Sequence, residues 1–182
     1  MTGPTNPGRR AFLGAGAAAA FSTVASPAFA SLGRAQYRLV ALDNLHTGEK
    51  LNVHYWVNGH YVRGALHQVN YNLRDFRNGH VHAIDPQLLD LLDGLRRLLN
   101  TGEPFQVISG YRSPETNAML HEESNGVAVN SLHVQGRAID IRLAGRSLRS
   151  LHKAAVRLRR GGVGYYPSAD FVHVDVGRVR YW

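Results

Sequence analysis

The 182-residue chain contains no cysteine. Disulfides, thiolate metal ligands, a cysteine nucleophile and a lipid anchor on cysteine are therefore excluded. Lysine is scarce as well: only Lys50 and Lys153 occur, so arginine carries almost all of the net charge of +8. The arginines are scattered along the chain rather than grouped, and no nucleic-acid-binding motif accompanies them. We expect a basic surface that tolerates an anionic wall or membrane, and no nucleic-acid partner.

The chain also lacks an apolar run long enough to span a bilayer comfortably. Its weakly apolar stretch at 14–24 is short and rich in Ala and Gly. A Gly-Arg-Arg-Ala-Phe-Leu motif precedes it at 8–13, and Ala-Phe-Ala follows at 28–30, which is the order of a twin-arginine signal with its cleavage site. We expect a signal peptide at 1–30, export to the periplasm, and no stable membrane insertion after cleavage; a short membrane anchor is the alternative.

Residues 31–182 have the length of one domain. Hydrophobic periodicity and turn signals divide them into short strands and longer helices. We expect strands at 37–42, 50–57, 105–109, 136–143, 163–166 and 171–176, and helices at 64–78, 86–99, 114–123 and 147–159. This irregular alternation, with hairpin-joined strands, predicts a single α+β domain with a small, mostly antiparallel sheet and helices on one side.

Three side chains in the second half of the chain have the chemistry of metal ligands. His133 and Asp140 lie seven residues apart, and His173 lies within a short apolar strand. Strand alternation places Asp140 and His173 opposite the apolar faces of their strands, so pairing of the two strands would bring their Cβ atoms to about 5 Å. Gly136 permits a sharp turn that brings in His133. Two histidines, one aspartate and an open position are typical of catalytic zinc, whereas unrelated loop and strand histidines are the alternative.

Four motifs occur in a fixed order along this region: Ser109-Gly-Tyr-Arg-Ser113, His133-x-x-Gly136-x-Ala138-x-Asp140, Gly161-Gly-Val-Gly-Tyr-Tyr-Pro167 and Phe171-Val-His-Val-Asp175. Together they resemble the zinc peptidases grouped with D-Ala-D-Ala carboxypeptidases and the Hedgehog fold, and within that group the murein endopeptidase K branch. The resemblance covers nearly all of 31–182 and the twin-arginine leader. It implies one Zn²⁺ held by His133, Asp140 and His173, and a peptidase that acts on the stem peptides and cross-links of peptidoglycan.

Arg112 and Asp170 are the further candidates for catalysis. Arg112 lies at a strand-to-helix turn, where a guanidinium suits an oxyanion or a substrate carboxylate; a salt bridge to Glu115 is the alternative. Three residues before His173, Asp170 is the candidate general base, although it could equally be a turn residue. Phe171 cannot serve as a base. We expect Asp175 to orient an imidazole and His152 to be a core or supporting histidine rather than a base.

The function that we expect is a monomeric, zinc-dependent endopeptidase that hydrolyses peptide cross-links in peptidoglycan. Two alternatives remain open at this point. One is a D,D- or L,D-carboxypeptidase that trims stem peptides, and the other is a non-enzymatic, zinc-containing domain that binds the wall. The sequence leaves open which cross-link bond is cut.

Overall fold

A computed structural model describes residues 1–3, 37–123 and 126–182 of the chain. Residues Ala35–Trp182 form one compact unit, separate from Met1–Arg34. The predicted signal peptide and its cleavage site lie almost wholly outside the described residues. Among the described residues, none of the helices combines the length and the apolar character needed to cross a membrane.

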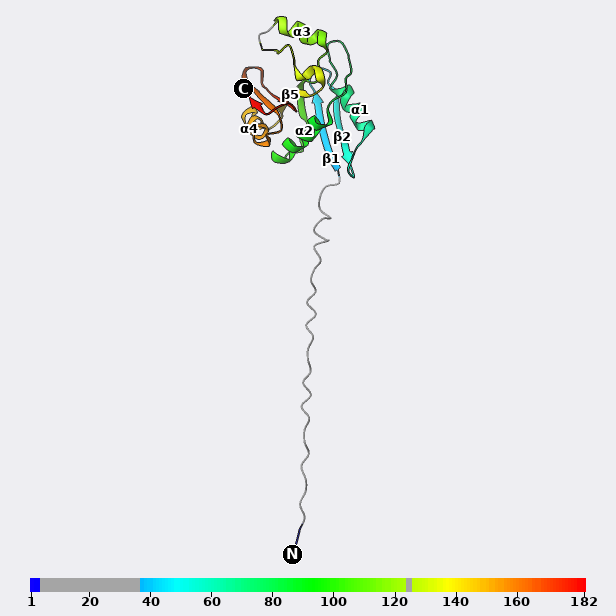
Figure 1. Ribbon diagram of the computed structural model, residues 1–182, viewed down its shortest axis with the longest axis vertical. Helices are drawn as coiled ribbons and strands as arrows, with labels where there is room; N and C mark the ends of the chain where they lie inside the picture. The colour runs from blue at the N-terminus through cyan, green and yellow to red at the C-terminus, as the bar shows by residue number, and fades with distance from the viewer. Residues whose placement is uncertain (4–36, 124–125) are drawn as a thin grey trace. The chain divides into compact units, whose positions relative to one another are not determined.

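A mixed, eight-stranded sheet organises this unit (Figure 1). Its strand order is β3-β2-β1-β4-β5-β7-β6-β8, and neighbours are antiparallel except for the pairs β1–β4 and β6–β8. The mostly antiparallel sheet expected from the sequence is therefore confirmed, and a two-residue strand lies at each of its edges. The strands are β1 (Tyr37–Asn44), β2 (Lys50–Val57), β3 (His60–Tyr61), β4 (Phe105–Ser109), β5 (Ala138–Leu143), β6 (Gly162–Tyr166), β7 (Phe171–Asp175) and β8 (Arg180–Tyr181).

The helices begin where the sequence supplies caps. Asp85 accepts a hydrogen bond from the backbone N–H of Gln87, and Ser147 accepts one from that of Ser150, which satisfies free donors in the first turn. The elements are α1 (Arg63–Asn72), α2 (Pro86–Leu98), α3 (Pro114–Glu123) and α4 (Leu148–Leu158), with the 3₁₀ turns η2 (Leu132–Gln135) and η3 (Pro167–Ala169).

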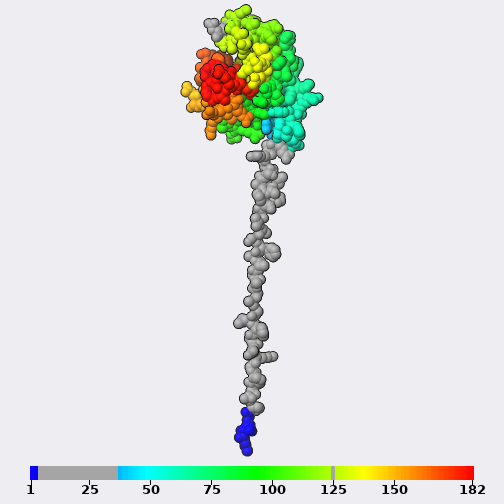
Figure 2. Space-filling view, in the orientation of Figure 1, coloured from blue at the N-terminus to red at the C-terminus, as the bar shows by residue number. Residues whose placement is uncertain are grey.

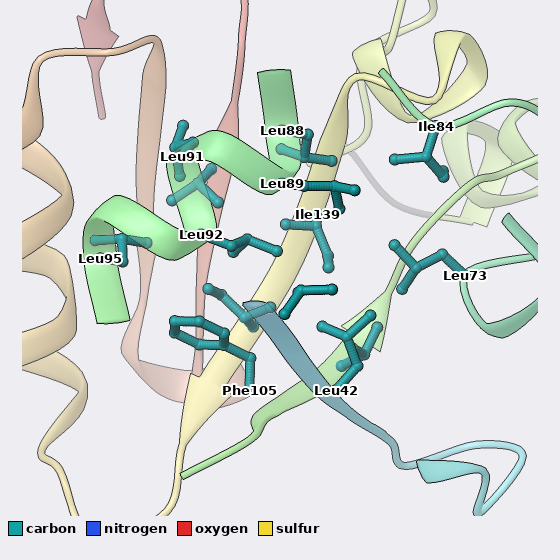
Figure 3. Packing of buried hydrophobic residues seen from close by; sticks show 14 of the residues in the cluster. Leu42, Leu73, Ile84, Leu88, Leu89, Leu91, Leu92, Leu95, Phe105 and Ile139 are labelled. Carbon is teal, nitrogen blue, oxygen red and sulfur yellow. The ribbon is translucent and has the colours of Figure 1, made fainter. Parts of the chain in front are cut away.

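One hydrophobic core joins α1, α2 and α4 to the sheet. Figure 3 shows Leu89 and Leu92 of α2 beside Ile139 of β5, with Phe105 of β4 and Leu42 of β1 in the same cluster. The fully buried members of this core run from Val40 to Val174. The unit Ala35–Trp182 therefore contains its own complete core, as an independently folding domain must.

Helix α1 is shorter than its apolar stripe predicts, because it ends at Asn72 and not at residue 78. Leu73 is still fully buried, but the chain turns away after it. The buried carboxylate of Asp75 accepts hydrogen bonds from the backbone N–H groups of Arg77 and Ser113. These bonds tie the segment to the start of α3 and satisfy backbone donors outside a helix.

Candidate metal centre and cleft

Strands β5 and β7 lie side by side and antiparallel, with Asp140 directly opposite His173. Their alternate residues, Ile139, Ile141, Val172 and Val174, are fully buried in the hydrophobic core. Because strand side chains alternate between faces, Asp140 and His173 point to the other face of the sheet. The sequence predicted that Asp140 and His173 would meet if the two strands paired, and the strands do pair, in the register that places them opposite each other.

His133 reaches the same place from η2, a 3₁₀ turn where the sequence predicted an irregular loop. The hydroxyl of Ser131 caps this turn by accepting from the N–H of His133 at 3.3 Å. Gly136 ends it in the left-handed conformation, at φ 65°. A Cβ atom at Gly136 would overlap the backbone oxygen of Ala83, so only glycine fits both the conformation and the space.

Three acceptor atoms converge at this point. Nδ1 of His173 lies 2.8 Å from Oδ1 of Asp140. Nε2 of His133 lies 3.2 Å from that Nδ1 and 3.3 Å from that Oδ1. The other ring nitrogens have their own partners: Nδ1 of His133 lies 2.7 Å from the carbonyl of Gly110, and Nε2 of His173 lies 3.1 Å from Oδ2 of Asp175.

These outer contacts decide what the cluster can hold. A ring nitrogen facing a carbonyl or a carboxylate oxygen carries its proton there, which leaves the opposite nitrogen with a lone pair. With both imidazoles neutral, they and Asp140 would present lone pairs to one another, so either a proton on Nδ1 of His173 or a metal ion must lie between them. A cation relieves that repulsion, and an outer hydrogen bond on each imidazole is the usual arrangement around a metal. The donor set therefore fits a metal ion, and the three ligand atoms all lie within 4.8 Å of one another.

Burial and mutual contact shift the acid–base properties of the cluster. Burial lowers the pKa of His133. Burial also opposes a charge on His173, but hydrogen bonds to Asp140 and Asp175 outweigh it and raise its pKa to about 8. Burial alone would raise the pKa of Asp140. The charges of the two imidazoles and their hydrogen bonds outweigh burial and hold this pKa far below the usual range. The carboxylate of Asp140 is therefore anionic at neutral pH.

Asp175 is fully buried and fixes His173 from behind. Besides His173, its carboxylate accepts from the backbone N–H groups of Gly162 and Gly177, and from Nη2 of Arg180 at 2.7 Å. A Cβ atom at Gly162 would overlap both this carboxylate and Arg180, so the second glycine of the Gly-Gly pair lets β6 approach it. The expectation that Asp175 contacts an imidazole agrees with this geometry.

Arg112 pairs with Asp140 rather than with Glu115. Its Nη2 lies 2.6 Å from Oδ2 of Asp140, the carboxylate oxygen that does not face the histidines, and its Nε donates to the hydroxyl of Ser109. The guanidinium is largely buried and stands directly beside the cluster. It therefore supplies a fixed positive charge beside the cluster.

Asp170 and His152 lie away from the three ligand atoms. Asp170 has a left-handed backbone, and its carboxylate accepts from Nη1 of Arg142 at 2.9 Å with 62% of the side chain exposed. It is not among the residues that line the cleft. His152 packs against the ring of Tyr165 on the core side of β6, as expected of a supporting histidine rather than a base.

The cluster forms the floor of a cleft of about 320 Å³. One wall is the segment 126–132, and the other is aromatic: the rings of Tyr166 and Phe171 stack at 4.5 Å, and Nε1 of Trp182 donates to the hydroxyl of Tyr166. Trp182 also approaches the ring of His173, at 5.3 Å between centroids. Figure 2 shows the last residues of the chain (red) beside the segment around residue 130 (yellow).

Trp182 and Arg180 are cleft residues that the sequence pattern did not reveal. They lie at and just after β8, a two-residue strand that pairs in parallel with β6. Trp182 continues that pairing, since its N–H donates to the carbonyl of Val163. A strand of two residues has no periodicity to detect, so nothing in the sequence placed these side chains at the cleft.

Comparison with known proteins gives an independent assignment. The family model described as Peptidoglycan L,D-endopeptidase MepK matches residues 33–182. The chain is 42% identical over 175 residues to the Peptidoglycan L,D-endopeptidase MepK of Escherichia coli K12, covering 96% of each chain. It is 38% identical over 168 residues to the Probable peptidoglycan L,D-endopeptidase MepK of Haemophilus influenzae, covering 92% of this chain and 90% of that one.

Among solved structures, the L-Ala D-Glu endopeptidase ChiX of Serratia marcescens overlaps 53% of this chain and 69% of its own, with a TM-score of 0.35 and 18% identity. The family match spans the whole described domain, including every residue of the cluster, and the two sequence relatives cover more than nine tenths of the chain. The chain therefore belongs to the Peptidoglycan L,D-endopeptidase MepK family and is an enzyme, a metallopeptidase.

Proposed function

We propose that this chain is a zinc-dependent endopeptidase that hydrolyses peptide cross-links between peptidoglycan stem peptides. The observation that carries the proposal is the convergence of two imidazole nitrogens and one carboxylate oxygen, each held by an outer contact, on the floor of a cleft. The membership of the chain in a family of peptidoglycan L,D-endopeptidases supports the substrate. We therefore expect the L,D type of cross-link bond to be cut.

In this proposal His133, Asp140 and His173 hold one Zn²⁺. Two neutral imidazoles and a carboxylate with an open fourth position are the donor set that suits catalytic zinc. Bound there, the ion supplies the Lewis acidity that activates a water molecule and polarises the amide carbonyl. Gly110 and Asp175 hold the two imidazoles in the tautomers that this requires.

Arg112 has two connected tasks in the proposed reaction. Its bond to Oδ2 keeps Asp140 oriented with Oδ1 toward the histidines. Its charge also stands where negative charge develops on the carbonyl oxygen, and loss of a preorganised donor of this kind typically costs about 10²–10³ in rate. A free carboxylate of the stem peptide could use the same guanidinium fork.

The two walls of the cleft suit a peptide rather than a compact metabolite. Tyr166, Phe171 and Trp182 present rings on one side, and Val127, Ala128 and Leu132 give an apolar surface on the other. Aromatic faces bind the aliphatic parts of a peptide while the cleft floor retains its polar groups. We propose that the stem peptide lies between these walls with its scissile amide over the cluster.

For the general base we keep Asp170 as the proposed residue, because it is the nearest acid to His173 in sequence, apart from Asp175, that the cluster does not already use. Its carboxylate is bonded to Arg142 in the structure, so this role requires that bond to be exchanged for one with the attacking water. Hydrogen bonds at catalytic groups often reach their working geometry only when substrate binds.

The test is digestion of defined, cross-linked muropeptide dimers by the zinc-loaded protein, with the products read by mass spectrometry. Conversion of L,D-linked dimers to monomers supports the proposal. Release of a single terminal amino acid would instead identify a carboxypeptidase. His133→Ala and chelated wild-type protein should both be inactive, and cleavage that survives both treatments overturns the proposal.

We further propose that residues 1–30 are a twin-arginine signal, that 31–182 is the mature enzyme, and that it acts in the periplasm as a monomer. The order of the Arg-Arg motif, the apolar stretch and Ala28-Phe29-Ala30 supports this. Replacing both Arg9 and Arg10 by Lys should abolish export, which cell fractionation measures.

A further inference from the structure

Helix α4 and its flanks carry positive charge without any acid. Residues 141–169 contain no Asp or Glu, but they contain seven cations: Arg142, Arg146, Arg149, Lys153, Arg157, Arg159 and Arg160. Along the sequence the arginines look scattered, because other residues separate them. On a helix, however, residues four positions apart are neighbours, so cations that are separated in the sequence lie next to one another on the helix surface.

Arg149, Lys153 and Arg157 form a cationic row along the exposed side of α4. The opposite side of the helix, with Leu151, Ala154 and Ala155, is buried against the sheet. From its first to its last member the row advances by eight positions, or about 12 Å of helix axis. Like charges four apart destabilise a helix, so the row is unfavourable for folding unless an anion neutralises it.

Among the described residues, no acid forms an ion pair with the row. In the described residues, Arg149, Lys153, Arg157 and the following Arg159 make no ion pair, whereas most other arginines have a carboxylate partner. The pairs Arg38–Asp90 and Arg74–Glu49 show the usual arrangement elsewhere on the domain. The exposed side of α4 therefore carries positive charge with no paired negative charge, and such a surface attracts an external anion.

The row and the cleft lie on opposite faces of the sheet. Helix α4 packs, through Leu151, on the face of β5 and β7 that carries Ile141 and Val172. Asp140 and His173 project from the other face of the same two strands. A ligand in the cleft cannot reach the row, so the row is not an extension of the substrate site.

We propose that the cationic row docks this protein on an anionic phospholipid bilayer, with the cleft directed away from the lipid. A flat charged surface can meet the whole row at once while leaving the opposite face open, and guanidinium groups match phosphate oxygens in geometry. A glycan or peptide strand bound at the row would instead be separated from the cleft by the sheet. The proposal does not depend on the proposed reaction.

The experiment measures partition of residues 35–182 onto sedimented vesicles at low and physiological salt. One set of vesicles is pure phosphatidylcholine, and the other contains about one third phosphatidylglycerol. Wild type is compared with the triple variant Arg149→Gln, Lys153→Gln and Arg157→Gln. The matched control has the same loss of charge at three exposed cations elsewhere: Arg63→Gln, Arg77→Gln and Arg178→Gln. Thermal unfolding of each protein verifies that it is folded.

We expect wild type to prefer the anionic vesicles, with added salt reducing the preference. Each cation near an anionic bilayer contributes on the order of fivefold, so the α4 variant should lose about 100-fold in partition. The control variant should lose less than about tenfold. Equal losses in both variants would reduce the effect to net charge and overturn the proposal. The proposal is also overturned if wild type shows no preference for anionic lipid. It is overturned as well if the protein binds lipid weakly but binds isolated peptidoglycan sacculi, and the α4 substitutions weaken that binding.

Discussion

Asp175 links the metal cluster to the end of the chain. It receives hydrogen bonds from His173, from two backbone N–H groups and from Arg180, so its position is fixed from several directions. Burial opposes its charge, but these donors hold its pKa well below the ordinary value, and it stays anionic. An anion behind an imidazole raises the basicity of the nitrogen that faces the metal.

We expect Asp175→Asn to weaken zinc affinity about 10- to 100-fold, as loss of an outer carboxylate partner usually does. Competition with a chromophoric chelator measures the affinity. Asp43→Asn is the control, since Asp43 has only a long surface pair with Lys50, 3.9 Å apart. If both variants bind zinc as tightly as wild type, Asp175 has no role in holding His173.

The carboxylate of Asp170 is either the general base or only the surface partner of Arg142, and substitution distinguishes the two roles. If it is the general base, Asp170→Asn should lower kcat about 10²- to 10⁴-fold with zinc affinity unchanged. If it is only the surface partner of Arg142, the change should stay within a few fold, because exposed ion pairs contribute little. Arg142→Gln is the matched variant, since it removes the pair but keeps the carboxylate. Steady-state kinetics on a cross-linked dimer decides between them.

At the scale of single elements, η2 depends on Gly136. We expect Gly136→Ala to lower the free energy of unfolding by at least about 2 kcal/mol, because the new Cβ adds a steric overlap to a strained left-handed residue. Gly79→Ala is the control, because Gly79 has φ 77° but a Cβ added there would meet no atom within 4 Å. This variant therefore has the backbone strain without the steric overlap. Urea unfolding of the metal-free variants measures both. Equal losses would show that η2 tolerates the overlap.

The strands that hold the site were predictable because burial on one face imposes an alternating pattern. That pattern placed Asp140 and His173 opposite the apolar faces of their strands, and the structure adds the strand pairing that brings them together. Other features depend on contacts that no local pattern records. Beyond the early end of helix α1, Asp75 binds the backbone N–H of Ser113, 38 residues away. Trp182 reaches the cleft through a strand too short to show a period. The cationic row required the helix itself, since its members are four residues apart.

For the whole molecule, buried carboxylates predict sensitivity to acid. The pKa values of Asp75, Asp140 and Asp175 all lie below their ordinary values, since hydrogen bonds and neighbouring charges outweigh burial. The folded state then binds protons more weakly than the unfolded state. Stability from these groups is present above about pH 4 and is lost as the pH falls through the folded values. We expect a loss of at least about 2 kcal/mol between pH 5 and pH 2 in urea unfolding.

The control for this acid sensitivity is Asp75→Asn, which cannot titrate at that position. Its free energy of unfolding at neutral pH should be lower than that of wild type, and its decline below pH 4 should be shallower. Asp75 is the suitable site because it lies outside the metal cluster and binds only protein groups. An unfolding free energy of wild type that is the same at pH 5 and pH 2 contradicts the prediction.

Metal binding should stabilise the whole domain, because the three proposed ligands come from β5, β7 and η2 and meet only in the folded chain. At free zinc 100-fold above its dissociation constant the gain is about 2.7 kcal/mol, which raises Tm by roughly 5–10 °C in a domain of this size. Mg²⁺ should give no such shift, since it prefers oxygen ligands. His133→Ala should abolish the zinc shift, while Asp170→Asn should retain it. Because nine other histidines remain in His133→Ala, any shift that persists in that variant measures zinc held elsewhere, and a full shift would remove His133 from the ligand set.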